Sequence, residues 1–525
     1  MKTIISKKKF TLSRGALAVA TTLLASHAYA DAVTDWNLYT ALATKGASSA
    51  AGTSGTASAA QNSNVSTRIA AIEARAVFDA VNTVNLFSPG KGYYTKPSVA
   101  TGGSAAAAVA KAAHDVLVGT LTNATVIGWL DTQLAAELTA LGVTTTEAGY
   151  IAGQNAAAAA LAARAGDYSA IRTTYIPSSN ISSTGTATEV GNPGVGLWRP
   201  SNGGKGDVDI NTGAPTGFTA GVVQPAGAID FNWKNVTPFS LSTLEKQKLV
   251  ALVPPSLKVG SAEYNAELSF VQTHGQEFLT PGLRTNNQLL QALYYKSDAE
   301  LFTNEVARKA SVARGLTLVQ NAKLFAALDS ALADARIAAF QSKYDLDFWR
   351  PITAINADSA GIATTFTWKP LGTTPSHPAS TGGHSTTVAA GVEILRAFFQ
   401  SDSIVPAATP VTLTGFTWLV GTNNGTGKLA TPLSGKDATS RDVRTFTQLQ
   451  LENGRSRIYL GVHFATDDFQ GQTLGLSVAD KIIDEQVDPA ISGLRVYKGN
   501  STVGSSANLR KLFVNNSTDS GYYGL

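Results

Sequence analysis

Lys343 and Arg350 are spaced so that both side chains could bind one anion. On a helix, positions seven apart lie about two turns apart on nearly the same face. The two side chains would therefore point the same way, just before Pro351 ends the helix. Two cations that project together repel each other unless an anion lies between them. For this segment alone, a solvated surface stripe with Asp345 and Asp347 as partners is the stronger alternative.

A glycine segment before His384 has the residue types that an oxyanion site needs. Gly382 and Gly383 precede a helix that we predict to begin near His384. Glycine lets the backbone approach a ligand closely, and free N–H groups at a helix start bind oxyanions. A histidine at that point could exchange protons with the anion. The alternative is an ordinary glycine turn with a histidine at a helix start.

His463 and Asp467 are spaced for direct contact if their segment is helical, because positions i and i+4 of a helix lie side by side. A carboxylate on one ring nitrogen fixes the tautomer of a histidine and raises the basicity of the other nitrogen. Such a histidine could ligate a metal or attack phosphorus, with Arg457 as a nearby cation. Two alternatives stay open. Asp467 could cap or solvate a helix, or it could satisfy a core histidine.

The elements that must position these residues are predicted to be mainly helices. Apolar residues recur at spacings of three and four, and the high alanine content suits close helix packing. Helical patterns cover 104–120, 123–141, 145–165, 286–344, 384–400, 439–453 and 458–486. Strand candidates are sparse, namely Val411–Leu413 and Phe416–Val420. The fold class is therefore mainly α, with two packed helical bundles and long irregular connections.

Composition divides the chain after residue 30 into four regions. Residues 31–165 are an N-terminal helical region, whose first part, 31–62, is predicted to be a weakly ordered lead-in. Residues 166–240 are rich in Gly, Pro, Asn, Ser and Thr and are predicted to be an irregular connection. Residues 241–490 form the catalytic helical bundle with all three chemical segments, and 491–525 form a polar C-terminal tail.

Residues 1–30 have the layout of a secretory signal peptide. The first fourteen residues carry five positive charges and no acid, and an apolar run covers Ala16–Ala25. The small residues Ala28 and Ala30 then flank the −2 position of a cleavage site, so the mature chain would start at Asp31. The run is far shorter than the ~20 residues of a spanning helix. We therefore expect a periplasmic or secreted protein without a membrane anchor.

Charge and sulfur content limit the possible partners. Removing the five basic residues of the signal peptide from 41 basic and 37 acidic residues leaves 36 against 37, about −1. This balance does not indicate nucleic acid or an anionic membrane as partner. The chain has no cysteine, and its single methionine is Met1. Oxidants attack thiols and thioethers first, so this composition suits a protein that releases an oxidant, although compositional drift explains it equally well.

Taken together, the three segments resemble the signature of the vanadium haloperoxidase and type 2 phosphatidic acid phosphatase superfamily. In this chain the signature reads Lys343-x6-Arg350-Pro351, then Gly383-His384, then Ser456-Arg457-x5-His463-x3-Asp467. The resemblance is strongest over about 320–485, where residues 333–340 and 453–463 are similar to those of vanadium-dependent haloperoxidases.

The resemblance implies a vanadate cofactor and a set of residues that bind it. Lys343, Arg350 and Arg457 would bind the vanadate oxygens, and Gly383 would donate a backbone N–H. His463 would form the protein's one bond to vanadium.

Two further residues would take part in the implied reaction. Asp467 would orient the metal-binding histidine, and His384 would act as general acid and base. With hydrogen peroxide, the enzyme would oxidise a halide to hypohalous acid.

One position departs from the family pattern. The family usually has serine just before the Gly-His pair, where this chain has Gly382. The loss of one hydrogen bond to a charged group is worth about 1.5–3 kcal/mol. Ser380, Thr381 or Ser385 could compensate for the missing hydroxyl.

The other histidines and one tryptophan bear on the choice of halide. His377 lies seven residues before His384, and a histidine there resembles the bromoperoxidase pattern. We therefore expect oxidation of bromide or iodide ahead of chloride, although His377 could be a loop residue without a role. Trp349 could line the halide site or pack against the bundle. His114 and His274 have no motif context and are expected to be structural.

The leading hypothesis is thus a secreted haloperoxidase that uses vanadate and hydrogen peroxide. One alternative is a secreted acid phosphatase, in which His463 forms a phosphohistidine and His384 protonates the leaving group. Another is a non-enzymatic protein on a decayed scaffold, which only Gly382 favours. A small organic substrate and a homodimer are both left open.

Overall fold

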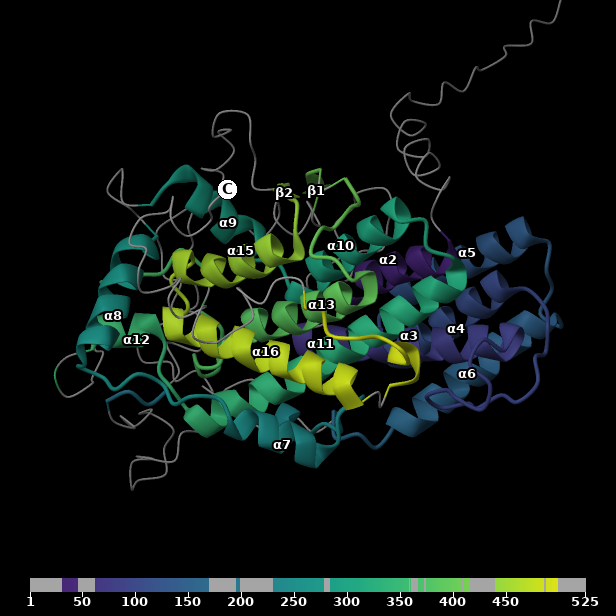
Figure 1. Ribbon diagram of the computed structural model, residues 1–525, viewed down its shortest axis with the longest axis horizontal. Coiled ribbons are helices and arrows are strands. Elements are labelled where there is room, and N and C mark those ends of the chain that lie inside the picture. Colours follow the sequence, from purple (N-terminus) through teal and green to yellow (C-terminus); the bar gives the residue numbers. More distant parts are fainter. Residues whose placement is uncertain are drawn as a thin grey trace, which may run out of the picture.

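The structure is a computed structural model that describes residues 31–45, 62–169, 195–198, 230–277, 284–357, 359, 367–372, 374–407, 409–414, 440–485 and 488–498 (Figure 1). Its helices are α2 (Ala32–Thr44), α3 (Ser63–Asn85), α4 (Ala105–Thr120), α5 (Ala124–Leu141), α6 (Ala148–Arg164), η3 (Phe231–Asn235), α7 (Thr243–Ala251), α8 (Ala262–His274), α9 (Asn286–Tyr294), α10 (Ala299–Ala313), α11 (Leu318–Leu346), α12 (Pro351–Asn356), α13 (Gly383–Phe399), α15 (Phe446–Tyr459), α16 (Ala465–Glu485) and η4 (Pro489–Ile491). Strands β1 (Val411–Leu413) and β2 (Arg441–Val443) pair antiparallel, with Val411 opposite Val443.

Helices α3, α4 and α6 form the first bundle, and α2 and α5 pack on α4 (Figure 1). Gly149 and Gly153 lie one turn apart on the face of α6 that meets α4. A Cβ atom at these positions would lie 2.1 Å from the Ser104 carbonyl oxygen and 2.4 Å from that of Ala108. The absence of side chains at the two glycines therefore lets α4 and α6 pack backbone to backbone.

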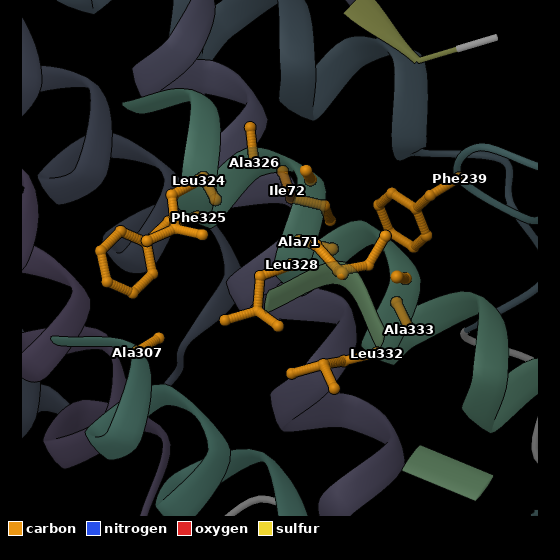
Figure 2. Packing of buried hydrophobic residues seen from close by; sticks show 14 of the residues in the cluster. Ala71, Ile72, Phe239, Ala307, Leu324, Phe325, Ala326, Leu328, Leu332 and Ala333 are labelled. Carbon is orange, nitrogen blue, oxygen red and sulfur yellow. The ribbon is translucent and has the colours of Figure 1, made fainter. Parts of the chain in front are cut away.

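Helix α11 connects the first bundle to the second. A capping box between Thr317 and Gln320 begins this helix. One side of α11 packs against α3, and other parts contact α13 and α16. Figure 2 shows Ile72 of α3 among Leu328 and Leu332 of α11 in the core. Because α11 is buried along most of its length, one hydrophobic core runs through both bundles.

The second bundle consists of α13, α15 and α16, with α9 against α15 and α10 against α13. The start of α13 lies very close to α16, because a Cβ atom on Gly475 would be 2.2 Å from the Thr386 carbonyl oxygen. This close packing brings the Gly383 end of α13 next to the first turn of α16, where Asp467 lies.

The mainly helical fold class and the strand at Val411–Leu413 are confirmed. The candidate strand Phe416–Val420 and the predicted signal peptide, 1–30, lie outside the described residues. Across the part of the chain that the structure describes, no helix combines the length and the apolar character needed to cross a bilayer.

Three predictions on local structure were wrong. The weakly ordered lead-in expected over 31–62 was wrong for residues 31–45, because α2 begins there with a capping box between Asp31 and Thr34, and Trp36 is fully buried. Residues 46–61 lie outside the described residues. The helix expected over 439–453 is preceded by β2 and begins only after Thr445, whose side chain caps it.

The single helix expected over 458–486 is broken between α15 and α16. Gly461 in the break has a φ of 77°, and a Cβ there would lie 2.4 Å from the Gly275 carbonyl oxygen. Only glycine fits this conformation and this close approach. The break also changes where His463 lies, since this residue is outside both helices.

Candidate oxyanion-binding site

His463 and Asp467 form the most completely bonded pair in the candidate site. His463 Nδ1 lies 3.0 Å from Asp467 Oδ2, which also accepts a hydrogen bond from the Phe464 amide at 2.9 Å. The Ser380 hydroxyl donates to the other carboxylate oxygen at 2.6 Å. An ionised carboxylate only accepts, so the imidazole proton is on Nδ1, and the lone pair of Nε2 can accept a hydrogen bond or bind a metal.

Cations surround the unprotonated nitrogen of His463. Arg350 Nη1 lies 3.1 Å from Nε2, and both residues are buried. Burial first, and then the charges of Arg350 and Lys343, hold the pKa of His463 well below its usual range. The ring is therefore neutral at neutral pH, as a metal ligand or a nucleophile must be.

Lys343 and Arg350 come together, but not on one helix as predicted. Helix α11 ends at Leu346, and Asp347 adopts the left-handed conformation with a φ of 46°. The segment after it bonds to 196–198, with the Trp198 amide donating to the Asp347 carbonyl oxygen at 2.7 Å. The helix was extended too far in the prediction because this pairing partner is about 150 residues away in the sequence, a separation that local patterns do not report.

Arg350 is held in place by carbonyl groups and by a second histidine. Its Nε donates to the His377 carbonyl oxygen at 2.9 Å, and its Nη1 donates to that of Val462 at 2.6 Å. Nη2 lies 2.9 Å from His377 Nδ1. Burial lowers the pKa of Arg350 to about 9, partly offset by Asp467.

Lys343 is fully buried and donates to two carbonyl oxygens of the loop before α13. Its Nζ lies 2.9 Å from the Pro378 oxygen and 3.0 Å from the Ala379 oxygen. Burial, and then the charge of Arg350, hold the pKa of Lys343 well below its usual range. An anion beside Lys343 and Arg350 would raise the pKa of Lys343 again, because its negative charge offsets both the burial and the repulsion between the two cations.

Gly383 begins α13, and the helix start borders the same group of cations. No side chain caps this N-terminus. A Cβ on Gly383 would meet Lys343 Cε at 3.7 Å and Arg336 Nη1 at 3.3 Å. The bare backbone therefore leaves the helix N–H groups open toward the cationic side chains, which is the arrangement that binds oxyanions.

Arg457 enters the site from α15. Its Nη1 donates to the Tyr295 carbonyl oxygen at 3.3 Å, while its buried Nε has no hydrogen-bond partner among the described residues. Burial lowers the pKa of Arg457 to about 10. An unpaired buried donor in a cationic site is what a missing anion would satisfy.

His384 is half-buried at the first turn of α13, and its Nε2 lies 3.0 Å from the Ser297 carbonyl oxygen. A carbonyl only accepts, so Nε2 carries the proton and Nδ1 is left as the base. Burial, and then Arg457 and Arg336, hold the pKa of His384 well below its usual range.

The two halide-site candidates lie in different surroundings. His377 contacts Arg350, and its ring lies 5.3 Å from that of Phe340. Trp349 is buried in an apolar cluster with Ile352 and Tyr264, and burial raises the pKa of Tyr264. These contacts favour the packing alternative for Trp349.

His114 and His274 lie in ordinary structural contacts. His114 bonds to Asp115 and Asp131 within the first bundle, each at 2.9 Å. His274 ends α8 and stacks on Phe270, with ring centroids 4.1 Å apart.

Sequence reasoning missed Arg336, whose guanidinium borders Gly383. The signal was present, because Arg336 precedes Lys343 by the same seven residues that separate Lys343 from Arg350. Only the first of these two pairs lies on one helix in the structure.

Fold and site together define a mainly helical protein with a buried cationic site around the neutral ring of His463. Among the described residues, no group of three or more His, Asp or Glu side chains could hold a metal cation. The donor set instead suits an anion that a single imidazole also binds.

Comparison with known proteins assigns the second bundle to a family. Residues 323–489 match the family model of the VCPO second helical-bundle domain. The vanadium chloroperoxidase of Curvularia inaequalis is 26% identical over 257 residues, an alignment that covers 41% of this chain and 42% of that protein. The second bundle of this chain is thus similar to that domain of the vanadium haloperoxidases, and the resemblance seen in the sequence is confirmed.

Solved structures show the same fold over most of the chain. A bacterial vanadium-dependent iodoperoxidase superposes with a TM-score of 0.60 at 17% identity, covering 86% of this chain and 95% of its own. A holo-type bacterial vanadium-dependent chloroperoxidase gives 0.56 at 18% identity, covering 82% and 93%. The fold therefore extends beyond the matched bundle to the N-terminal helices.

Proposed function

We propose that this protein is a vanadate-dependent haloperoxidase that uses hydrogen peroxide to oxidise halide to hypohalous acid. One observation carries the proposal. The unprotonated Nε2 of His463 lies 3.1 Å from Arg350 in a buried site that also contains Lys343 and Arg457. Because the alignment with the curated chloroperoxidase covers less than half of that protein, the activity rests on this site as well as on the family.

The residues present fit vanadate. Vanadate has the shape and charge of phosphate, and guanidinium groups match such oxygens well. Lys343, Arg350, Arg457 and the Gly383 N–H would hold the oxygens, and His463 Nε2 would bind vanadium. The unpaired Nε of Arg457 and the uncapped start of α13 support this assignment. When bound, vanadate makes hydrogen peroxide electrophilic enough for a halide to attack.

The protein's own contribution is to hold protons and charges in place. Asp467 keeps the imidazole proton of His463 on Nδ1, so that Nε2 stays available. The cations withdraw electron density from the bound oxygens. His384, which is neutral because of its depressed pKa, accepts a proton at Nδ1 and returns it later.

His377 supports the proposed preference for bromide or iodide over chloride. Its Nδ1 lies 2.9 Å from Arg350 Nη2, so a change at position 377 would alter the contacts of one of the cations in the site. The similar proteins include both chloroperoxidases and an iodoperoxidase, so they do not favour one halide. The proposed preference therefore rests on His377 alone.

The remaining assignments belong to the same proposal. Residues 1–30 would be a signal peptide, 31–165 an N-terminal helical region, 166–240 a connection, 241–490 the catalytic bundle and 491–525 a tail, in a periplasmic or secreted protein. N-terminal sequencing of the exported protein, with Asp31 expected first, would test the processing site.

A bromination assay with purified protein tests the function. We expect activity only when bromide, hydrogen peroxide and orthovanadate are all present, and none in His463→Ala. A phosphate-ester assay on the same samples separates the alternative, in which Nε2 of His463 attacks phosphorus. Ester hydrolysis without bromination would make the protein a phosphatase, and failure to bind either anion would favour a non-enzymatic role.

A further inference from the structure

Arg336 is a fourth cation at the candidate site. It lies on α11 two turns before Lys343, so the two side chains project from the same face of one helix. Arg336 Nη1 and Lys343 Cε lie 3.3 and 3.7 Å from the point where a Cβ on Gly383 would be. Both cations therefore border the space beside the uncapped start of α13.

The guanidinium of Arg336 has donors to spare, although its side chain is buried. Its Nε donates to Asn64 Oδ1 of α3 at 2.8 Å, and this is the one hydrogen bond that its side chain makes to described residues. Asp230, Asp298 and Glu300 offset its charge from a distance without forming an ion pair. A buried guanidinium ordinarily uses most of its five donors.

Two of the three hydroxyls that could replace the family's serine are already hydrogen-bonded, and the third lies between two helices. Ser380 donates to Asp467, and Thr381 bonds to Ser342. Ser385 lies in the contact between α13 and α16, where a Cβ on Gly471 would be 2.8 Å from the Ser385 Cβ. None of the three hydroxyls is therefore described beside Arg336 and Lys343, because two are bonded elsewhere and that of Ser385 lies in the α13–α16 contact.

Position 382 itself has no room for a side chain. A Cβ on Gly382 would lie 2.9 Å from the Asp467 carbonyl oxygen and 3.1 Å from the Ser385 hydroxyl. The α13–α16 contact thus excludes serine here, and any compensating donor must come from another element.

We propose that Arg336 binds an oxygen of the tetrahedral oxyanion beside Gly383 and takes over the role of the hydroxyl that is missing at position 382. The inference rests on the proposed function for the identity of the anion. Asn64 acts as a positioning residue, because it holds Nε and so aims the terminal nitrogens at the helix start. The first bundle thereby contributes to the site in the second.

Anion binding to the full chain, free of vanadate, tests the proposal. Orthovanadate and inorganic phosphate are titrated by calorimetry into wild type, Arg336→Gln and Arg336→Lys, and thermal unfolding is recorded without anion. Glutamine keeps a donor for Asn64 but removes the charge. The control is Arg308→Gln on α10, since Arg308 also donates to an asparagine, Asn37, at 2.5 Å.

We expect Arg336→Gln to bind both anions about ten- to a hundredfold more weakly, the range that one charge-assisted hydrogen bond gives. Arg336→Lys should lose less, because the charge remains. Arg308→Gln should bind like wild type. Arg336→Gln should unfold at no lower temperature than Arg308→Gln. Removing the Arg336 guanidinium relieves its repulsion with the other buried cations of the site.

Three outcomes would overturn the inference. They are wild-type anion affinity in Arg336→Gln, an equal affinity loss in Arg308→Gln, and a change confined to the KM for halide. Failure of wild type to bind either anion would overturn both this inference and the proposed cofactor. Tight vanadate binding by wild type without halide oxidation would refute the proposed function alone. The titrations of the Arg336 variants would then still decide whether Arg336 binds the anion.

Discussion

His463 donates through Nδ1 to Asp467 Oδ2 at 3.0 Å, although His463 lies in the break before α16 and Asp467 lies in the first turn of that helix. The carboxylate also accepts from the Phe464 amide, so it fixes the histidine and the start of the helix at once. One side chain therefore sets the direction of the imidazole and the position of the backbone that carries it.

Asp467→Asn should weaken the binding of orthovanadate about ten- to a hundredfold, because the amide no longer stabilises the Nδ1–H tautomer with a full charge. His463→Ala should abolish vanadium binding altogether. Equilibrium dialysis with metal analysis measures both. The matched control is Asp468→Asn, because Asp468 is equally buried but bonds to Gln472 instead. Equal affinity in Asp467→Asn and wild type would contradict the role of Asp467.

Gly382→Ser should not restore the family's hydroxyl contact. The new Cβ would overlap the Asp467 carbonyl oxygen, and we expect a loss of about 1–3 kcal/mol in the free energy of unfolding. Gly382→Ala should lose as much, because the side-chain carbon and not the hydroxyl causes the overlap. Denaturant unfolding and vanadate titration check this. A serine variant that binds vanadate more tightly than wild type at unchanged stability would show the expectation to be wrong.

Gly461→Ala should destabilise the break that carries His463. Alanine at a φ of 77° costs about 1–2 kcal/mol, and its Cβ would also lie 2.4 Å from the Gly275 carbonyl oxygen. Gly142→Ala is the control, because Gly142 has a φ of 65° with no atom within 4 Å of the new Cβ. Gly461→Ala should therefore lose more stability than Gly142→Ala and also lose vanadate affinity. Equal losses of stability in the two variants would show that the overlap with the Gly275 carbonyl oxygen does not contribute.

Asp329→Asn should make stability less dependent on pH. Burial raises the pKa of Asp329 to about 7, while an unfolded aspartate titrates near 3.9. Because the pKa is raised on folding, the contribution of Asp329 to the free energy of unfolding is complete below pH ~4 and is lost as the pH rises through about 7. The slope of this loss is at most about 1.4 kcal/mol per pH unit. The pKa of Glu73 is raised too, first by burial and then by Asp329, and this effect should shrink in the variant. Melting temperatures between pH 5 and 8 test this, and parallel profiles for variant and wild type would disprove it.

His377→Phe should shift the halide preference toward chloride. The substitution removes the ring nitrogen that lies 2.9 Å from Arg350 Nη2 and leaves that charged donor unpaired. We expect the ratio of bromide to chloride oxidation to fall about tenfold, the effect of one hydrogen bond to a charged group. Steady-state rates with each halide give the ratio, and Trp349→Phe, which changes a residue of the apolar cluster, serves for comparison. An unchanged ratio in His377→Phe would leave the residue without a part in selectivity.

The sequence determined the mainly helical class and the residues that could do chemistry. Alanine content and apolar spacing of three and four are local properties that the helices of both bundles retain in the structure. The contact between His463 and Asp467 was also predicted, although for the wrong reason. The two residues meet because Asp467 also accepts from the Phe464 amide, and not because both lie on one helix.

Only the tertiary structure decided which cations meet and which hydroxyls are available. Lys343 and Arg350 converge because distant residues 196–198 pair with the chain beyond α11, and Arg336 reaches the site because α13 starts beside it. Glycines on α16 allow the close approach to α13 that fills position 382, and Ser380 donates to Asp467 of the same helix. These contacts join segments more than forty residues apart, and their free energy depends on packing geometry that spacing along the chain does not encode.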